Sequence, residues 1–255
     1  MKKVLLACGI LAVMGLFQSA DATSWDTFVI REGSTSAPTI QSRNDVAPGA
    51  MEFIITESGQ KAGWGTQAAN GLKVGQLFNI FIDRLDDYTR FTAGSGPAVG
   101  PYINIWVTDG MGNYAVIANE PSNAEWQPGN NQWDIETWAE LSTKIVKVYE
   151  STGWVGSVST FADVANLTIA PPPLSYLPDA NFTSGANGVG TGAPRNLYTG
   201  ETYGFNFVFG DTLSNYVSGD DGYIVANPKV VPEPATVALI STGIAAMAAR
   251  KRKLV

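Results

Sequence analysis

The segment YINIWVTDGMGNYAVIANE, residues 102–120, constrains the fold of this chain more than any other part of it. Two runs rich in β-branched and aromatic residues, Tyr102–Thr108 and Asn113–Asn119, flank the glycine-containing stretch Asp109–Gly112. Glycine supplies the backbone conformations that tight turns between antiparallel strands require. The segment therefore predicts a β-hairpin, and a hairpin of this length needs further strands to bury its apolar side chains.

Other segments have the same strand character. Leu77–Asp83 is apolar on both faces except at Asn79, which is typical of a more central strand. Alternation places Met51, Phe53 and Ile55 on one face of a strand. The remaining predicted strands are Trp25–Glu32, Met51–Glu57, Lys144–Glu150, Tyr203–Phe209 (with Phe205, Phe207 and Phe209 together) and Gly222–Pro228. We expect the first and the last of all these strands at sheet edges.

Helical signals are scarce. Thr160 and Asp163 have the spacing of a capping box and predict a helix of about two turns, and 133–141 is a candidate for one further turn. Strands separated by glycine-rich loops favour an all-β fold, a single antiparallel β-sandwich or jelly-roll domain with long loops. We find no repeat of fixed period, which argues against a propeller or a solenoid.

The stretch Ala170–Asn196 is rich in Pro, Gly and Asn and is expected to be a long loop. It could link two domains. The two strands predicted beyond it are too few to build a second core. The sequence therefore favours one domain with a long insertion.

Composition excludes several kinds of chemistry. The chain has no histidine, so it lacks the commonest general base, the usual zinc ligand and any Ser-His arrangement. Its single cysteine, Cys8, lies in the first ten residues. Thiol catalysis, disulfides and cysteine metal sites are therefore excluded from the rest of the chain, which we expect to be non-enzymatic and to need no cofactor.

The first 22 residues have the features of a secretory signal peptide. Lys2 and Lys3 form a basic start, an apolar stretch follows, and Ala20–Ala22 forms an A-x-A cleavage site. Leu5–Cys8 imitates the lipoprotein cleavage motif, but too few apolar residues precede it to form the hydrophobic region of a signal. We therefore predict export and a mature chain that starts at Thr23.

The other end of the chain has three parts in a fixed order. Pro232, Glu233 and Pro234 come first, 15 uncharged residues follow from 235 to 249, and Arg250, Lys251, Arg252 and Lys253 come last. A helix of that length spans about 22 Å, less than a hydrocarbon core of about 30 Å, and snorkelling basic side chains can cover the difference. The four basic residues would stop transfer and stay cytoplasmic.

This C-terminus resembles the PEP-CTERM sorting signal of exopolysaccharide-producing Gram-negative bacteria. The resemblance covers about a tenth of the chain, and its apolar segment is richer in alanine and threonine than is usual in the family. It implies recognition at Pro232–Pro234 and processing by an exosortase. The alternatives are a plain tail anchor or a buried C-terminal helix, and a buried helix would not be apolar all round and then end on four bases.

The segment left after both ends are removed is acidic. If the tail is cut before Glu233, ten Lys and Arg and 21 Asp and Glu remain, a net charge of −11, against −7 for the whole chain. Such a surface repels nucleic acid and anionic lipid. It would also repel an acidic polysaccharide unless divalent cations bridged the two.

A tryptophan-rich stretch, residues 119–141, is the best candidate for ligand binding. Trp126, Trp133 and Trp138 lie there among amides and the carboxylate of Asp134. Aromatic platforms beside polar groups suit a glycan. We favour the alternative that these tryptophans cover the core, because aromatic side chains supply large buried areas in any fold.

Acidic residues offer two further interpretations. Asp134, Glu136 and Glu140 could include a glycosidase pair, although their spacing matches no motif of that class. The turns with Asp83, Asp86 and Asp87, or with Asp220 and Asp221, could bind Ca²⁺, although neither has an EF-hand pattern. Acidic residues in turns usually serve backbone geometry, which is the interpretation we favour.

The sequence as a whole predicts a signal peptide (1–22), a β-sandwich body (23–229) and a sorting and anchor segment with a transmembrane helix (230–255). The expected partners are the export machinery, an exosortase, the inner membrane transiently and exopolysaccharide, with no nucleic acid. The expected location is the outer surface or the extracellular matrix, and the expected role is structural or adhesive. A lectin-like carbohydrate-binding module is the alternative, and a glycoside hydrolase is a third hypothesis.

Overall fold

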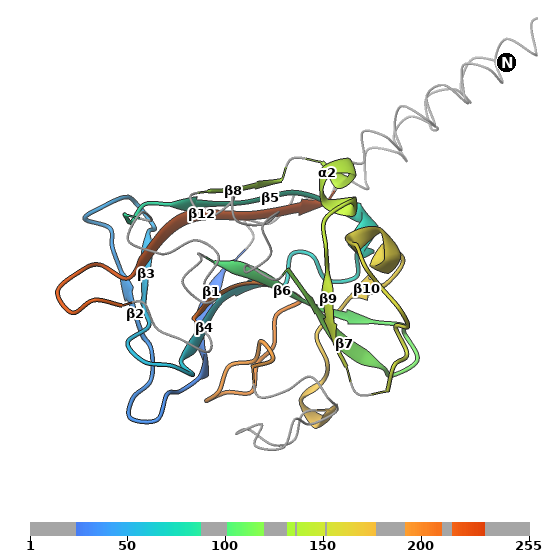
Figure 1. The fold of residues 1–255 in the computed structure, drawn as a ribbon, viewed down its shortest axis with the longest axis horizontal. Coiled ribbons are helices and arrows are strands. Elements are labelled where there is room, and N and C mark those ends of the chain that lie inside the picture. The colour runs from blue at the N-terminus through green and yellow to red at the C-terminus, as the bar shows by residue number, and fades with distance from the viewer. Residues whose placement is uncertain are drawn as a thin grey trace, which may run out of the picture.

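A computed structural model describes residues 24–87, 101–119, 132–135, 137–150, 152–176, 192–210 and 216–232. These residues form two antiparallel sheets that pack face to face (Figure 1). The all-β prediction is confirmed. Neither of the two predicted membrane segments lies among the described residues.

The larger sheet has seven strands and contains the predicted hairpin. In order across the sheet, its strands are β1 (Asp26–Arg31), β4 (Lys61–Thr66), β11 (Phe205–Gly210), β6 (Tyr102–Thr108), β7 (Tyr114–Ala118) and β9 (Lys147–Tyr149). The remaining strand, β10 (Thr168–Ile169), pairs with β6. In the hairpin, Thr108 pairs with Tyr114, so the turn lies where the glycines predict it.

The smaller sheet has five strands. In order across the sheet they are β2 (Thr39–Ser42), β3 (Met51–Ile54), β12 (Tyr223–Pro232), β5 (Leu77–Arg84) and β8 (Gln132–Ile135). β1 is an edge strand of the larger sheet, as predicted. The expectation that the final strand is also an edge strand is wrong, because β12 lies between β3 and β5. Of the two strands that follow the long loop, β11 thus lies inside the larger sheet and β12 inside the smaller sheet.

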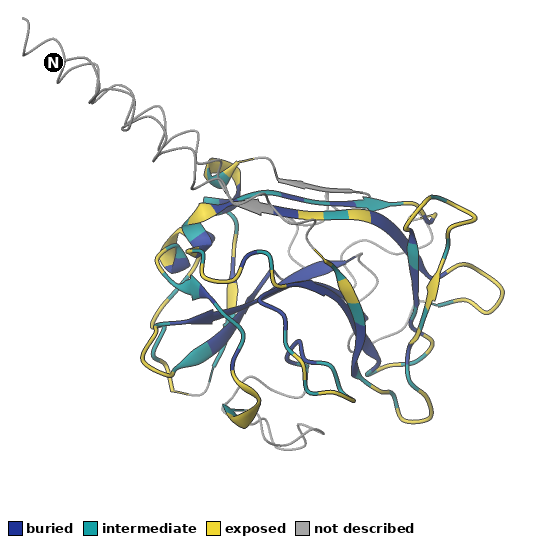
Figure 2. Cartoon of the chain, turned by 180° about the vertical axis from the view of Figure 1, so that it is seen from behind, coloured by how far each residue is buried: buried dark blue, intermediate teal, exposed yellow. Residues whose placement is uncertain are grey.

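The inner faces of the two sheets share one hydrophobic core (Figure 2). The rings of Phe53 from β3 and Phe209 from β11 stack across it with centroids 3.9 Å apart. Phe205 and Phe207 are fully buried in the same core, which confirms that the three phenylalanines of β11 share a face. Trp25, just before β1, stacks on Phe207 at 5.7 Å.

The outer face of the larger sheet is also covered. Phe28 and Tyr203 stack with ring centroids 5.1 Å apart over β4. A Cβ at Gly63 would lie 2.6 Å from the Phe28 ring, and one at Gly65 would lie 2.7 Å from Tyr203. The two glycines of β4 therefore let aromatic rings approach the sheet closely.

Helical segments are short, as predicted. They are η2 (Val74–Gln76), α2 (Trp138–Ser142), η5 (Phe161–Val164) and η6 (Leu174–Tyr176). The capping box is confirmed, since the Thr160 amide donates to Asp163 Oδ2 at 2.9 Å, but the helix it starts is a single 3-10 turn. Among the described helices, none has the length and apolar character needed to cross a membrane.

The first strand starts, and the last strand finishes, at the same end of the molecule. Asp26 at the start of β1 pairs with Gly65 near the end of β4, and Pro232 at the end of β12 pairs with Leu77 at the start of β5. Residues 67–76 connect β4 to β5, so these two strand ends lie together. We call this the β4–β5 end; the described chain both begins and finishes there.

Candidate functional site

The last strand runs directly into the predicted sorting motif. β12 was expected to end near Pro228, but it continues to Pro232, the first residue of that motif. Val231 pairs with Phe78 and Pro232 pairs with Leu77, both in β5. The strand therefore extends three residues beyond the predicted end of the body at 229.

Two irregularities set the register of this strand pair. β12 carries an extra residue near Asn227, and β5 carries one near Asn79. Both asparagines have left-handed backbone, with φ of 51° and 50°, and they are the only described non-glycine residues with positive φ. Because the two β-bulges lie on opposite strands they cancel, so Val231 and Pro232 return to the register that the strands had at Val225.

Side chains hold the segment between the bulges against β5. Asn227 Nδ2 donates to Asp83 Oδ2 at 2.8 Å. The Lys229 ammonium lies 5.2 Å from the centroid of the Phe81 ring, and Val230 is buried in the core. Anchors of three kinds thus immediately precede the motif.

Of the predicted sorting residues, only Pro232 falls within the described part of the chain, where it closes β12. Glu233, Pro234 and the predicted stop-transfer residues Arg250, Lys251, Arg252 and Lys253 lie outside it. Their assigned roles stay predictions.

The tryptophan-rich stretch is described in part. Trp133 and Asp134 lie in β8, which pairs with β5 at Ile82 and Phe81, and Trp126 lies outside the described residues. Trp138 begins α2 after the N-cap Thr137, and its half-buried side chain packs against the main core. Of the carboxylates in the glycosidase hypothesis, Glu140 is exposed on α2 and Glu136 lies outside the described residues. Of this set, the structure describes the side chains of Trp138 and Glu140 alone, and the first packs on the core while the second is exposed.

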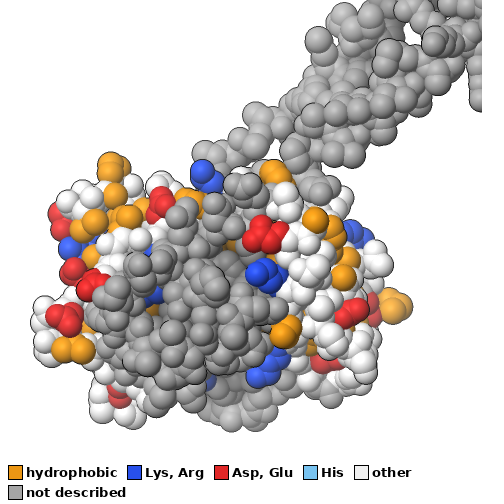
Figure 3. Space-filling model, turned by 45° about the horizontal axis from the view of Figure 1, so that its top comes forward, with side chains coloured by type: hydrophobic (Ala, Val, Ile, Leu, Met, Phe, Trp, Pro, Cys, Tyr) orange, Lys and Arg blue, Asp and Glu red, His pale blue; other side chains and the backbone are white. Residues whose placement is uncertain are grey.

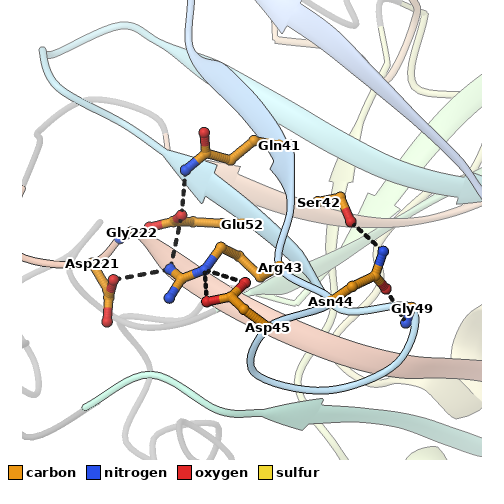
Figure 4. Close-up of polar contacts among 9 residues, drawn as sticks. All are labelled: Gln41, Ser42, Arg43, Asn44, Asp45, Gly49, Glu52, Asp221 and Gly222. Atoms are coloured by element: carbon orange, nitrogen blue, oxygen red, sulfur yellow. Dashed lines mark hydrogen bonds and ion pairs between the residues drawn. The ribbon is translucent and has the colours of Figure 1, made fainter.

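A polar cluster joins β2, β3 and the start of β12 (Figure 4). The buried Glu52 carboxylate accepts hydrogen bonds from Gln41 Nε2 at 2.7 Å, from an Arg43 guanidinium nitrogen at 3.0 Å and from the Gly222 amide at 2.6 Å. The same guanidinium donates to Asp221 at 2.9 Å and to Asp45 at 3.1 Å. One guanidinium thus pairs with three carboxylates, two of them exposed, and the cluster keeps a net negative charge.

This pairing shifts the pKa values of Arg43 and Asp45. Hydrogen bonds that Arg43 donates to Asp45, then to Asp221 and Glu52, raise the pKa of its guanidinium above the ordinary value. The Arg43 guanidinium in turn lowers the pKa of the Asp45 carboxyl. Arg43 and Asp45 are therefore charged at neutral pH, and the cluster is an ion-pair network.

The predicted calcium residues lie beside this cluster. Asp220 is exposed, and Asp221, whose side chain is 58% exposed, is bonded to Arg43. Among the described residues, no three His, Cys, Asp or Glu side chains are placed so that they could hold a metal ion. In the other predicted turn, Asp86 is bonded to Arg84 at 3.0 Å with both side chains fully buried. In each turn, one of the predicted calcium ligands is thus paired with an arginine.

Sequence reasoning missed Arg43, Glu52 and the Asn227 bulge. Glu52 lies between apolar neighbours in its strand, which is a weak signal of a buried charge, but nothing local connects it with Asp221, 169 residues away. Asn79 did stand out, as the one polar residue within the run 77–82.

Comparison with known protein families gives a match at the end of the last strand. The family model of the PEP-CTERM protein-sorting motif matches residues 230–253, which begin in β12 and continue beyond the described chain. No curated protein and no solved structure matches the chain. The chain therefore has, at residues 230–253, a segment that matches the PEP-CTERM protein-sorting motif.

Proposed function

We propose that the chain is the precursor of an exported protein of the cell surface or extracellular matrix, sorted by an exosortase through Pro232, Glu233 and Pro234. Residues 1–22 direct export, and residues 230–255 hold the precursor briefly in the inner membrane. The body between them is a single β-sandwich of the jelly-roll type, and processing delivers it to the outer surface or the matrix.

One observation carries this proposal. The match to the sorting motif begins at residue 230, and the last strand of the fold ends at Pro232. A buried C-terminal helix would instead have to pack on the core beyond β12. The position of the motif just where the described fold finishes supports a segment that can be cut off without removing a strand.

The role of the body is proposed to be structural or adhesive and non-enzymatic, with exopolysaccharide as its partner. The absence of histidine and the position of Cys8 in the signal peptide support this. Charged side chains of both signs are scattered over the described part of the face in Figure 3, without a basic patch for nucleic acid. Since the body is acidic, contact with an acidic polysaccharide would need divalent cations between them.

The carbohydrate-binding alternative gains no support from the described side chains. Trp138, the one predicted platform whose side chain is described, packs on the main core. That placement suits a tryptophan that supports the fold. We therefore propose no second function.

Mass spectrometry of the protein from its native host tests the proposal. The mature protein should start at Thr23 and lack Arg250–Lys253, while Glu233→Ala should accumulate in the inner membrane with its basic end intact. Asp220→Ala, which changes an exposed acid elsewhere, should be processed like the unmodified chain. Secreted protein that retains Arg250–Lys253 would contradict the proposal.

A further inference from the structure

The fold leaves no free chain between its last strand and the sorting motif. Pro232 is at once the first residue of the motif and the last residue of β12, where it is paired with Leu77. A linker of a few residues would have separated the two. We propose that the folded body holds the start of the motif in its sheet, so that processing requires the end of β12 to separate from β5; this rests on the proposed function.

The hold on this segment is built into the strand pair. Val231 and Pro232 pair with Phe78 and Leu77 because the two bulges cancel, and without that cancellation the last residues of β12 would be out of register. Val230, immediately before them, is 4% exposed and belongs to the main core. Opening can therefore involve Val231 and Pro232 alone, with Val230 as the point at which it stops.

Processing needs the same backbone that the sheet uses. Enzymes that recognise peptides commonly bind them as extended segments through main-chain hydrogen bonds. A residue that is paired with β5 cannot present that edge of its backbone to an enzyme. The competent form is then the fraction of molecules in which the strand end has opened, and the apparent affinity for the enzyme falls by that fraction.

A linker should remove this restraint. Eight Gly and Ser residues inserted between Val231 and Pro232 would carry the whole motif away from the sheet. In a pulse-chase experiment in the native host, we expect the precursor to be converted about tenfold faster, because the strand end no longer has to open. The same insert between Gly219 and Asp220, in a turn far from the motif, should leave the rate unchanged.

A disulfide should strengthen the restraint. Cross-strand partners lie close enough for a disulfide, and the mature body has no cysteine that could compete. Val231→Cys with Phe78→Cys should nearly abolish conversion when oxidised and recover it on reduction. Thr39→Cys with Ile54→Cys, a paired position between β2 and β3 in the same sheet, is the matched control and should be processed normally.

The outcomes separate this inference from the proposed function. If the unmodified chain is never shortened, the proposed function is wrong. If it is shortened, but the linker gives no acceleration and the oxidised variant with Val231→Cys and Phe78→Cys is cut at the normal rate, the enzyme acts on the closed strand and the inference is wrong. Should the linker variant lose its resistance to trypsin and so prove unfolded, the disulfide variant decides alone.

Discussion

At the scale of single residues, two asparagines direct the path of the last strand. Asn79 and Asn227 adopt left-handed backbone, which asparagine tolerates better than other residues that have a Cβ. Each sits at one of the two bulges that compensate each other between β5 and β12. The polar interruption at Asn79 could be seen in the sequence. Its meaning depends on Asn227, a bulge partner 148 residues away, and so could not be.

Substitution of Asn79 tests this backbone requirement. Asn79→Ala should lower the free energy of unfolding of the mature body by about 1 kcal/mol, because a Cβ disfavours left-handed backbone and alanine has no polar group to compensate. Asn79→Gly, which permits the conformation, should stay within about 0.5 kcal/mol of the unmodified protein. Urea unfolding followed by circular dichroism measures both, and an alanine variant as stable as the glycine variant would contradict the explanation.

At the scale of elements, the sequence indicated most of the strands but not their neighbours. Runs rich in apolar, β-branched and aromatic residues marked β1, β3, β5, β6, β7, β9, β11 and β12. β2 and β4 escaped notice, since β2 is short and largely exposed and β4 contains two glycines that suggest a loop. β12 was misplaced at an edge because its neighbours, β3 and β5, are set by long-range pairing that no local pattern records.

The buried ion pair of Arg84 and Asp86 secures one of these pairings. Asp86 accepts hydrogen bonds from Arg84 and, at 3.1 Å, from the Ile224 amide of β12, while the Arg84 guanidinium lies 5.3 Å from the centroid of the Tyr223 ring. The pair thus fastens the end of β5 to the start of β12.

Removal of one partner should therefore be costly. Asp86→Ala is expected to lower the free energy of unfolding by about 3–5 kcal/mol, because it leaves a buried guanidinium without this counter-ion. Asp45→Ala removes an ion pair with Arg43 in which the Asp45 side chain is 67% exposed. This substitution should lower the free energy of unfolding by at most about 1 kcal/mol. Equal losses in urea unfolding would show that burial does not set the strength of the first pair.

At the scale of the whole molecule, both ends of the described chain lie at the β4–β5 end. Neither the alternation of strands nor the two predicted signals gives this, because it depends on which strand pairs with which. It means that the body can fold completely while the predicted signal peptide and the predicted tail are both still in the membrane.

Distance measurements between spin labels test this arrangement. In the mature body, cysteines at Ser24 and Lys229 should be closer together than cysteines at Ser24 and Asp220 by about 10 Å or more, because Lys229 and Asp220 are separated by most of the length of β12 at about 3.3 Å per residue. All three positions are exposed, and the body has no native cysteine. A distance from Ser24 to Lys229 that equals or exceeds the distance from Ser24 to Asp220 would contradict this arrangement.

The location of the last strand also fixes how the processed protein would be oriented. Any anchor joined to the new C-terminus at Pro232 would grip the body at the β4–β5 end. The turns at 43–50 and 216–222, which the ion pair of Arg43 with Asp221 joins, lie near the start of β12. In a surface layer of such molecules, every copy would expose these same turns to its surroundings.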